Sequence, residues 1–471
     1  MKMFAAGQWL DRDKTIDVHN PFDGSVVDTV PRATLADVER ALAGAAAGAA
    51  IMRDMPGFDR YKILHKAAEL MRQRAEKLAR TISLEEGKIL SEGRLEVDRA
   101  TETIELSAEE AKRLGGEVLP LDGAPGGAGK LGFTLRVPCG VVAAITPFNF
   151  PLNLVAHKVG PALAAGNAVI IKPASDTPLS ALSLVEILLE AGLPPLAIAC
   201  LTGSGKELGD AICGDSRVRK ISFTGSQEIG EHITRVAGVK RVTLELGSNS
   251  PLVVLEDANL DKVAKAAVAT GFANAGQVCI STQRIIAIGS TYQQLIDRLR
   301  ADVAALKVGN QMDEATQVGP MIRESDAERV TSWIDEAVAN GARVVVGGER
   351  HGSIVTPAVV ADVAPAMRVS CEELFGPAVA VTAAKNADEA IHLANNTRFG
   401  LSASVFTESL DAAMRFARRV ESGNIHINWG PQWRADLMPY GGLKQSGLGK
   451  EGPKYAIQEM TELKTVVIHG V

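Results

Sequence analysis

Between residues 140 and 236 the sequence alternates short apolar runs with helix-forming stretches, and this alternation limits the possible folds more than any other feature. It predicts strands over 141–145, 167–172, 196–202 and 218–224, and helices over 151–165, 179–191, 206–212 and 227–236. Strands that alternate with helices in this way usually form a parallel sheet with helices on both faces. The segment is therefore predicted to be a doubly wound α/β sheet.

The flanking segments predict further elements on both sides of this sheet. Thr34 to Asp37 fits a capping box that begins a helix, and a second α/β segment is expected from about residue 248 to residue 440. A chain of 471 residues is long enough for more than one domain. The other predicted elements are short strands within 3–30, helices over 58–86 and 90–113, a loop or hairpin over 120–132 and a strand over 461–468.

Composition and charge exclude several classes of function. The net charge is −6 with both signs mixed along the chain, which gives no basic surface for nucleic acid. No apolar run reaches 18 residues, so no membrane span is predicted. The five cysteines are odd in number and not closely spaced, which argues against a disulfide framework and favours the cytoplasm. The eight histidines are scattered, so no metal site is predicted.

Two residues stand out as candidates for chemistry. A helix predicted over 260–275 leads into Gly276, which is expected to end it, and Cys279 follows on a loop before an apolar strand. A thiol held between two rigid elements suits nucleophilic chemistry, although most cysteines are simply small buried side chains. Glu245 lies in the apolar strand 242–246, where it either faces a cavity with a raised pKa or points to solvent from an edge strand.

These two stretches resemble a known family. Residues 272–280 resemble the catalytic-cysteine signature of the aldehyde dehydrogenase superfamily, and Thr243 to Gly247 resemble its glutamate signature. The resemblance runs from about Met3 to the C-terminus and implies an α/β fold with three parts. These are a cofactor-binding domain (1–116 and 139–247), a catalytic domain (248–440) and a small β oligomerisation element (117–138 and 454–471). It also implies a homodimer or homotetramer, because the C-terminal strand pairs across a subunit interface in the family.

The resemblance implies a role for each catalytic residue. Cys279 would attack an aldehyde, and Glu245 would activate water. Asn149, in the stretch 146–151, would stabilise the oxyanion together with the Cys279 amide, although Phe148 stands where tryptophan is frequent. Without the resemblance, Asn149 reads as a helix N-cap before Pro151.

The resemblance also implies NAD or NADP as cofactor. Lys172 would contact the adenosine ribose, Glu373 the nicotinamide ribose, and the Gly225-Ser226 turn the pyrophosphate. Ser175 stands where many NAD-preferring relatives carry glutamate, which permits NADP, although Asp176 could restore the negative charge. The remaining expected cofactor contacts are Thr146, Pro147, Phe148, Gly247 and Phe375. Glycine spacing alone gives neither a Rossmann motif nor a P-loop.

The substrate is predicted to be a small polar or anionic aldehyde, because Arg99, His157 and Arg434 occupy positions that line the substrate tunnel in relatives. A hydroxyaldehyde such as lactaldehyde, or a three-carbon phospho or sulfo aldehyde, ranks above phosphonoacetaldehyde, because Val278 replaces an arginine found in some anion-using relatives. Arg99 could instead pair with Glu96 or Glu102, Arg434 with Asp436 or a partner subunit, and His157 could be a core residue. Other readings are a succinate-semialdehyde-type enzyme, a CoA-acylating relative, a cysteine esterase or thiol acyltransferase, and a non-catalytic relative.

Overall fold

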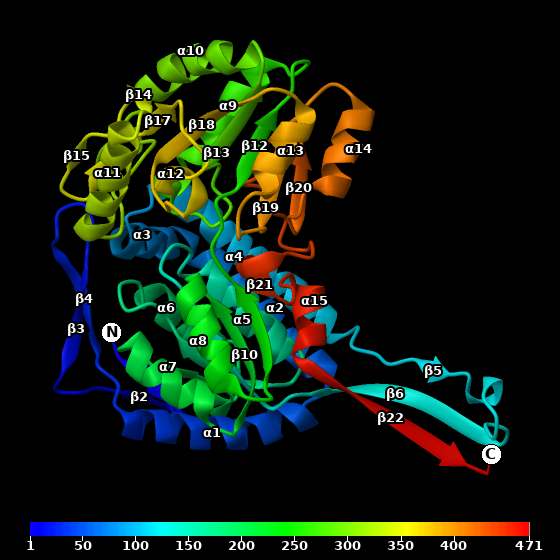
Figure 1. Cartoon of the computed structure of the whole chain (residues 1–471). Coiled ribbons are helices and arrows are strands. Elements are labelled where there is room, and N and C mark those ends of the chain that lie inside the picture. The colour runs from blue at the N-terminus through cyan, green and yellow to red at the C-terminus, as the bar shows by residue number, and fades with distance from the viewer. Residues whose placement is uncertain (471) are drawn as a thin grey trace.

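The computed structural model describes residues 1–470 as two α/β bodies, one above the other, with a long β ribbon that projects from the lower body (Figure 1). The lower body contains an eight-stranded sheet in the order β2-β1-β9-β8-β7-β10-β11-β21. Its strands are β1 (Met3–Ala5), β2 (Gln8–Leu10), β7 (Val141–Ile145), β8 (Ala168–Lys172), β9 (Ile198–Cys200), β10 (Val218–Thr224), β11 (Arg241–Glu245) and β21 (Gly447–Leu448).

The predicted doubly wound sheet is confirmed. Strands β9, β8, β7, β10 and β11 are parallel neighbours, and the chain reverses its direction of winding between β7 and β10. One face of the sheet is covered by α1, α7 and α8, and the other by α4, α5 and α6. The helices of this body are α1 (Leu35–Asp54), α2 (Gly57–Gln73), α3 (Ala75–Glu86), α4 (Leu90–Ala111), α5 (Asn153–Ala164), α6 (Leu179–Glu190), α7 (Gly205–Gly214), α8 (Gln227–Ala237) and α15 (Pro453–Glu459).

Thr34 forms the predicted capping box: its hydroxyl accepts from the Asp37 amide, and the Asp37 carboxylate accepts from the Thr34 amide. The single helix predicted over 58–86 is wrong, because the chain breaks at Arg74 into α2 and α3. The apolar side chains of both helices face the same core, and both helices pack against α4 and α6, while α2 also packs against α5. The continuous apolar pattern of a shared core does not reveal the break at Arg74.

The upper body contains a seven-stranded sheet in the order β14-β17-β18-β13-β12-β19-β20, in which β14 alone is antiparallel to its neighbour. Its strands are β12 (Pro251–Val254), β13 (Arg284–Ile288), β14 (Arg343–Val346), β17 (Ala358–Ala361), β18 (Ala378–Ala384), β19 (Ser402–Phe406) and β20 (Asn424–Ile427). Its helices are α9 (Leu260–Gly271), α10 (Thr291–Ala304), α11 (Glu324–Ala339), α12 (Arg368–Cys371), α13 (Ala387–Asn395) and α14 (Leu410–Arg419). Helices α9, α10 and α11 cover one face, and α13 and α14 the other.

Two two-stranded ribbons complete the list of strands outside the projecting element: β3 (Thr15–His19) with β4 (Val26–Pro31), and β15 (Arg350–His351) with β16 (Ile354–Val355). The short strands expected near the N-terminus therefore exist, although only β1 and β2 join the main sheet.

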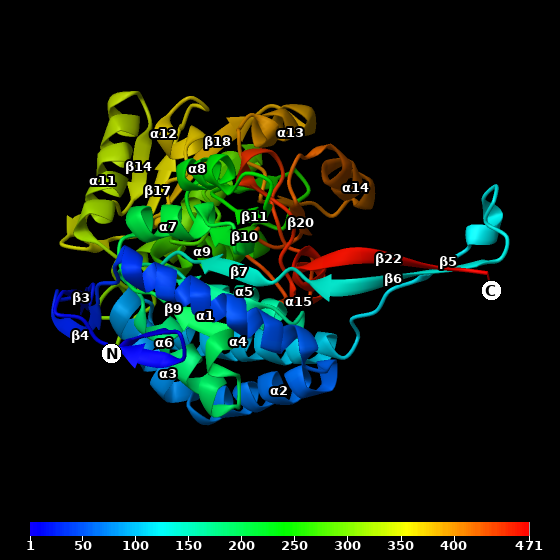
Figure 2. The same ribbon diagram turned by 90° about the horizontal axis from the view of Figure 1, so that it is seen from below.

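The projecting ribbon consists of β5 (Val118–Leu119), β6 (Lys130–Pro138) and β22 (Thr461–His469), as Figures 1 and 2 show from two sides. The predicted C-terminal strand is β22, and it pairs with β6 of its own chain along its whole length. Its other edge has no strand partner within residues 1–470. Helix α15, which was assigned to the oligomerisation element, instead packs Ile457 into the core of the lower body.

No helix within residues 1–470 is long and apolar enough to cross a membrane. The same part of the chain holds no group of three or more His, Cys, Asp and Glu side chains arranged to bind a metal ion.

Candidate active site

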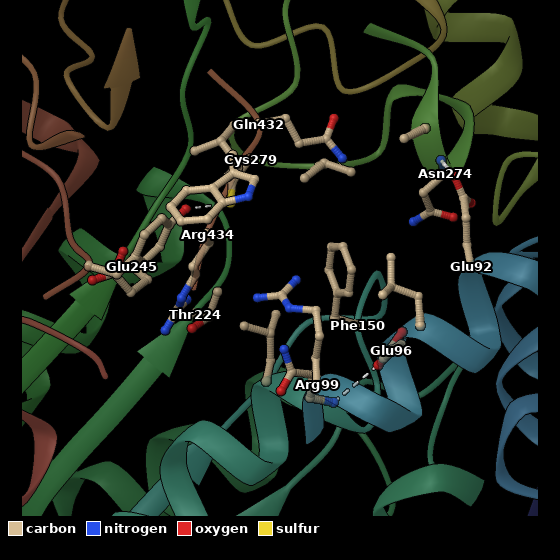
Figure 3. A pocket seen from close by; sticks show the side chains of 18 of the residues that line it. Glu92, Glu96, Arg99, Phe150, Thr224, Glu245, Asn274, Cys279, Gln432 and Arg434 are labelled. Atoms are coloured by element: carbon tan, nitrogen blue, oxygen red, sulfur yellow. Dashed lines mark hydrogen bonds between the residues drawn. The ribbon is translucent and has the colours of Figure 1, made fainter. Parts of the chain in front are cut away.

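A cavity of about 330 Å³ lies where the two bodies meet, and Cys279 and Glu245 both line it (Figure 3). Its walls come from α4, from the loop before α5, from the ends of β10 and β11, from the loop that carries Cys279 and from the segment 432–440. The alternation of strands and helices therefore brings residues from all parts of the chain to one edge of the first sheet. In Figure 3 the guanidinium of Arg99 reaches from α4 into the open space below Cys279.

The loop that carries Cys279 begins earlier than predicted. Helix α9 ends at Gly271, and Asn274 and Ala275 adopt left-handed φ angles of 49° and 52°. The Asn274 amide donates to Glu92 at 3.1 Å and its side chain donates to Glu86 at 2.9 Å, so contacts from α3 and α4 override the helical tendency of this alanine-rich stretch.

Gly276 consequently does not end the helix as predicted. It has a φ of 72°, and a Cβ added there would lie 2.1 Å from the carbonyl oxygen of Gly376. This glycine instead allows the catalytic loop to pass directly against the segment 373–376 of the second body.

Cys279 is half-buried, and its Sγ lies 3.3 Å from the hydroxyl of Tyr440. Burial raises the pKa of the thiol to about 12, and the charges of Glu373 and Glu245 act in the same direction. The Tyr440 hydrogen bond and the charge of Arg434 oppose this shift. Tyr440 was not predicted as a site residue, because a tyrosine before two glycines has no distinctive sequence signal.

Asn149 is buried, and its side-chain amide donates to the carbonyl oxygen of Gln277 at 2.8 Å. The N-cap reading is wrong, because α5 begins at Asn153 and the first amides of that helix donate to the carboxylate of Glu96. The carbonyl of Asn149 accepts from the ammonium of Lys88 at 2.6 Å. The backbone of Asn149 is therefore held from the loop between α3 and α4, and its side-chain amide is directed toward the loop that carries Cys279.

Glu245 ends β11, which lies between β10 and β21, so the edge-strand reading is wrong. Both carboxylate oxygens are buried and have no hydrogen-bond partner among the described residues. Burial raises the pKa of Glu245 well above its ordinary value, and the nearby carboxylate of Glu451 raises it further. Such a group is poised to exchange a proton with a molecule in the cavity.

Arg99 and Asp436, far apart in sequence, form a bidentate ion pair at the wall of the cavity. The Arg99 Nη2 donates to Asp436 at 2.8 Å and its Nε donates at 3.2 Å, while a quarter of the side chain remains exposed. The predicted alternatives, pairs with Glu96 or Glu102, are wrong, because Glu96 binds Lys88 instead and the Arg99 contacts go to Asp436. Burial alone would raise the pKa of Asp436, but His157 and Arg99 hold it well below its usual range.

His157 lies behind Arg434 and does not itself face the cavity, contrary to the prediction. Its Nε2 is 2.8 Å from Asp436, and its Nδ1 is 3.1 Å from the Nη2 of Arg434. Nδ1 therefore accepts and Nε2 carries the proton. Burial lowers the pKa of His157 to about 4, as does the neighbouring charge of Arg434.

Arg434 lines the cavity, but its two Nη groups are already engaged. Nη1 donates to Glu451 at 3.2 Å, Nη2 donates to His157, and the guanidinium lies 4.0 Å from the centre of the Tyr440 ring. The predicted alternative partner Asp436 is wrong, since Asp436 binds Arg99 and His157. Glu451 is also bound at 2.7 Å by the buried Lys158.

The expected cofactor residues lie at the carboxyl ends of the parallel strands, where the order of the sheet reverses. Thr146 follows β7, Lys172 ends β8, and Gly225 and Ser226 follow β10 at the start of α8. Ligands of open α/β sheets bind at such a reversal. The hydroxyl of Thr146 is buried there without a hydrogen-bond partner in residues 1–470, and burial lowers the pKa of Lys172 to about 8. These residues fit a dinucleotide.

The nicotinamide side of the predicted site is equally well defined. The carboxylate of Glu373 accepts from the Ser248 amide at 2.9 Å, and burial raises its pKa to about 7. A Cβ on Gly247 would lie 2.3 Å from this carboxylate, so the glycine makes room for Glu373. Phe148, which follows Pro147, packs edge to face against Phe375 at 5.8 Å.

On the adenosine side, the hydroxyl of Ser175 donates to the carbonyl of Gly203 at 2.9 Å. The carboxylate of Asp176 accepts from the Nε of Arg323 at 3.0 Å, so its negative charge is compensated from the second body.

Comparison with known proteins adds to this geometry. Residues 9–466 match the model of the aldehyde dehydrogenase family. The chain is 45% identical over 467 residues to a 3-sulfolactaldehyde dehydrogenase of Priestia aryabhattai, which covers 99% of this chain and 98% of the relative.

Two solved structures are similar over nearly their whole length. An aldehyde dehydrogenase from Physcomitrella patens, in complex with the reaction product succinate, has a TM-score of 0.97 at 39% identity and covers 100% of this chain and 98% of its own. A glyceraldehyde-3-phosphate dehydrogenase from Methanocaldococcus jannaschii, complexed with NADP, has a TM-score of 0.94 at 37% identity and covers 98% of this chain and 100% of its own.

Proposed function

Because this chain belongs to the aldehyde dehydrogenase family, we propose that it oxidises a small anionic or hydroxylated aldehyde to the carboxylate, with NAD or NADP as cofactor and Cys279 as nucleophile. One observation carries the substrate class: the partly exposed guanidinium of Arg99 reaches into the cavity that also contains Cys279 and Glu245 (Figure 3).

Cys279 attacks the aldehyde carbon as a thiolate and forms a thiohemiacetal. The side-chain amide of Asn149 and the backbone N–H of Cys279 bind the oxygen that becomes negative. Lys88 supports this step, because its ammonium holds the carbonyl of Asn149. When bound, the nicotinamide supplies the acceptor for the hydride. Lys172 and the start of α8, at the reversal of the sheet, and Glu373, from the second body, would hold that cofactor.

Glu245 then activates the water that hydrolyses the thioester. Its carboxylate faces the cavity and has no hydrogen-bond partner in the described chain, so a water molecule can take that place. Its raised pKa means that the ionised, basic form increases as the pH rises.

The contacts of Arg99, Arg434 and His157 support a different role in substrate binding for each of the three residues. Arg99 contacts the anionic or hydroxyl group, because its Nη1 is not used by Asp436. Arg434 contributes positive charge to the wall, and His157 fixes the orientation of Arg434. The relatives named above act on a sulfonated hydroxyaldehyde and on a phosphorylated aldehyde, or hold a dicarboxylate product. A charged arm on the aldehyde is their common feature, and Arg99 suits such an arm.

A CoA-acylating activity is less well supported, since thiolysis does not need the base that Glu245 supplies. A cysteine esterase or thiol acyltransferase leaves Lys172, at the sheet reversal, and Glu373, in the second body, without a role. The free edge of β22 supports a homodimer or homotetramer, because an unpaired strand edge is a natural place for another subunit to pair. A reducing compartment such as the cytoplasm is proposed as well, because all five cysteines are free.

The test is the absorbance of reduced nicotinamide on mixing the protein with aldehydes of three kinds: lactaldehyde, an anionic three-carbon or four-carbon aldehyde, and propanal. Each is run with NAD and with NADP, with and without CoA. We expect CoA-independent oxidation that is fastest with the anionic or hydroxylated aldehydes. Cys279→Ala should lose oxidation by several orders of magnitude while cofactor binding remains. Near-normal turnover by that variant, or a preference for long aliphatic aldehydes, would contradict the proposal.

A further inference from the structure

The hydroxyl of Tyr440 makes a hydrogen-bond contact with the thiol of Cys279. Its oxygen is 3.3 Å from the Sγ of Cys279, and only 3% of the residue is exposed. Within residues 1–470 the hydroxyl has no other hydrogen-bond contact. The phenol is therefore directed at the sulfur and is not shared with another polar side chain of the wall.

We propose that Tyr440 is a further catalytic residue, whose hydroxyl donates a hydrogen bond to the thiolate of Cys279 while Arg434 holds the ring from its face. The proposal rests on Cys279 being the nucleophile, as proposed above. It concerns how the thiolate is formed and kept, and it adds no covalent step: the thiol proton leaves to solvent, and the phenol keeps its own.

The direction of the hydrogen bond follows from chemistry. A thiolate can only accept, so the phenol must donate once the thiol has lost its proton. Tyr440 can remain the donor throughout, because burial and the nearby sulfur raise its pKa well above the ordinary value of a phenol. Hydrogen bonds to ionised groups are about twice as strong as neutral ones, so formation of the thiolate strengthens this contact.

The surroundings of Cys279 make such a donor necessary. Burial and the carboxyl groups of Glu373 and Glu245 all favour the neutral thiol. Opposing them are the hydroxyl of Tyr440 and the positive charge of Arg434. Without the phenol, the thiolate would have one favourable neighbour fewer in a site that otherwise disfavours its charge.

Arg434 is well suited to fix the ring. Its guanidinium lies 4.0 Å from the centre of the Tyr440 ring, a distance typical of a cation–π contact. Glu451 and His157 bind its two Nη groups, so the guanidinium cannot turn away from the ring without losing both contacts. The network that surrounds Arg434 thus orients the phenol through the ring face and leaves the hydroxyl free for the sulfur.

The thiolate can be measured directly by its alkylation. The full-length protein, without cofactor or aldehyde, is treated with iodoacetamide at pH 6 to 10, and modification of the peptide that contains Cys279 is followed by mass spectrometry. Tyr440→Phe keeps the ring and removes only the hydroxyl. This pH range lies below the raised pKa of the thiol, so the alkylation rate follows the small fraction of thiolate and increases with pH. We expect the rate for Cys279 in Tyr440→Phe to be about 10- to 100-fold lower across the range, as for the loss of one hydrogen bond to a charged group. An alkylation rate within about twofold of the wild type at every pH would overturn the proposal.

Two controls and a second variant separate the causes. Cys371 in the same digest reports the reagent and the pH, and Tyr61→Phe, which removes a hydroxyl from α2 outside the cavity, should leave Cys279 unchanged. Arg434→Lys keeps a positive charge near Glu451 but removes the flat guanidinium from the ring, so it should lower the alkylation rate of Cys279 by a smaller factor than Tyr440→Phe does. An unchanged alkylation rate in Arg434→Lys would overturn the role given to Arg434.

The outcomes also distinguish this proposal from the proposed function. If the wild type oxidises aldehydes and Tyr440→Phe leaves the alkylation profile unchanged, the role of Tyr440 is refuted and the function stands. If Tyr440→Phe shifts the profile but no aldehyde is oxidised by the wild type, the hydrogen bond to the thiolate stands and the proposed function is refuted.

Discussion

Replacement of Arg99 by methionine should selectively remove the preference for anionic aldehydes. Methionine keeps most of the apolar stem that packs along α4 and removes the guanidinium from the cavity. Asp436 loses the bidentate contact but keeps its hydrogen bond with His157, so its carboxylate is not left without a partner. Cys279 and Glu245, the proposed nucleophile and base, do not contact Arg99 through any hydrogen bond, so the chemical steps should continue.

The size of the effect follows from the contact that is lost. A hydrogen bond to a charged group contributes about 1.5 to 3 kcal/mol, which corresponds to about 10- to 150-fold in rate. Asp436 already offsets part of the positive charge, and a quarter of the Arg99 side chain is exposed to solvent. Asp436 and the solvent both screen the charge of Arg99, so the hydrogen bond contributes less to substrate binding. We therefore expect kcat/KM for an anionic aldehyde to fall by about 10- to 50-fold, at the lower end of that range.

The assay compares kcat/KM for an anionic aldehyde with that for propanal, which has no group for Arg99 to bind. Propanal should change by less than about threefold. Arg94→Met provides a matched control, because Arg94 is on the same helix but pairs with Glu76 and Glu314 and does not line the cavity. Equal losses on both substrates would refute the assignment, since they would indicate a general disturbance of the site.

Three further predictions concern other parts of the molecule. Glu245→Gln should give a burst of reduced cofactor followed by slow turnover, with acyl-enzyme visible by mass spectrometry; the absence of both would exclude Glu245 as the hydrolytic base. Ser175→Glu should lower kcat/KM for NADP by tenfold or more and leave that for NAD unchanged. Arg323 already compensates the charge of Asp176, so the new carboxylate would be the negative charge that repels the 2′-phosphate. Unchanged kinetics with NADP would contradict this interpretation of the pocket. Burial raises the pKa of Glu86 to about 8, so its stabilising contribution is full below pH 4.5 and lost as the pH rises through about 8. The Tm of Glu86→Gln, measured at pH 6 and pH 9, should fall less over this interval than that of the wild type.

The elements of the first sheet could be predicted closely because their patterns are local. Strands 141–145 and 218–224 agree with β7 and β10 at both ends. The first is an apolar run, and the second ends at the turn that Gly225 begins. The end of α9 could not be predicted in the same way. Ala273 and Ala275 continue a helical pattern, but hydrogen bonds from Asn274 to Glu86 and Glu92 bend the chain, and those partners lie about 180 residues earlier.

In the candidate site too, features of local sequence could be predicted and long-range contacts could not. Cys279, Asn149 and Glu245 could be selected from sequence because each lies in a short stretch that resembles a family signature, and the fold brings them to one region. The side chains that pair with the site residues, and so set their pKa values and orientations, could not be selected from the sequence. Arg99 and Asp436 are 337 residues apart, and the contact between Tyr440 and Cys279 spans 161 residues. Such contacts depend on how the two bodies meet, and no periodicity within either segment encodes them.

The charges around the cavity explain why an anionic substrate suits this site. The three cations Arg99, Arg434 and Lys158 alternate in space with the two carboxylates of Asp436 and Glu451. While Glu245 is protonated and neutral, this row of side chains therefore carries one positive charge in excess. An anionic aldehyde can supply the missing negative charge next to Arg99, the cation of this group that is partly exposed. Ionised Glu245 can supply it from the other end, next to Glu451 and Arg434. The comparison of Arg99→Met on charged and neutral aldehydes measures the first of these balances, because the variant removes one of the three positive charges and leaves two cations, Arg434 and Lys158, with two carboxylates, Asp436 and Glu451.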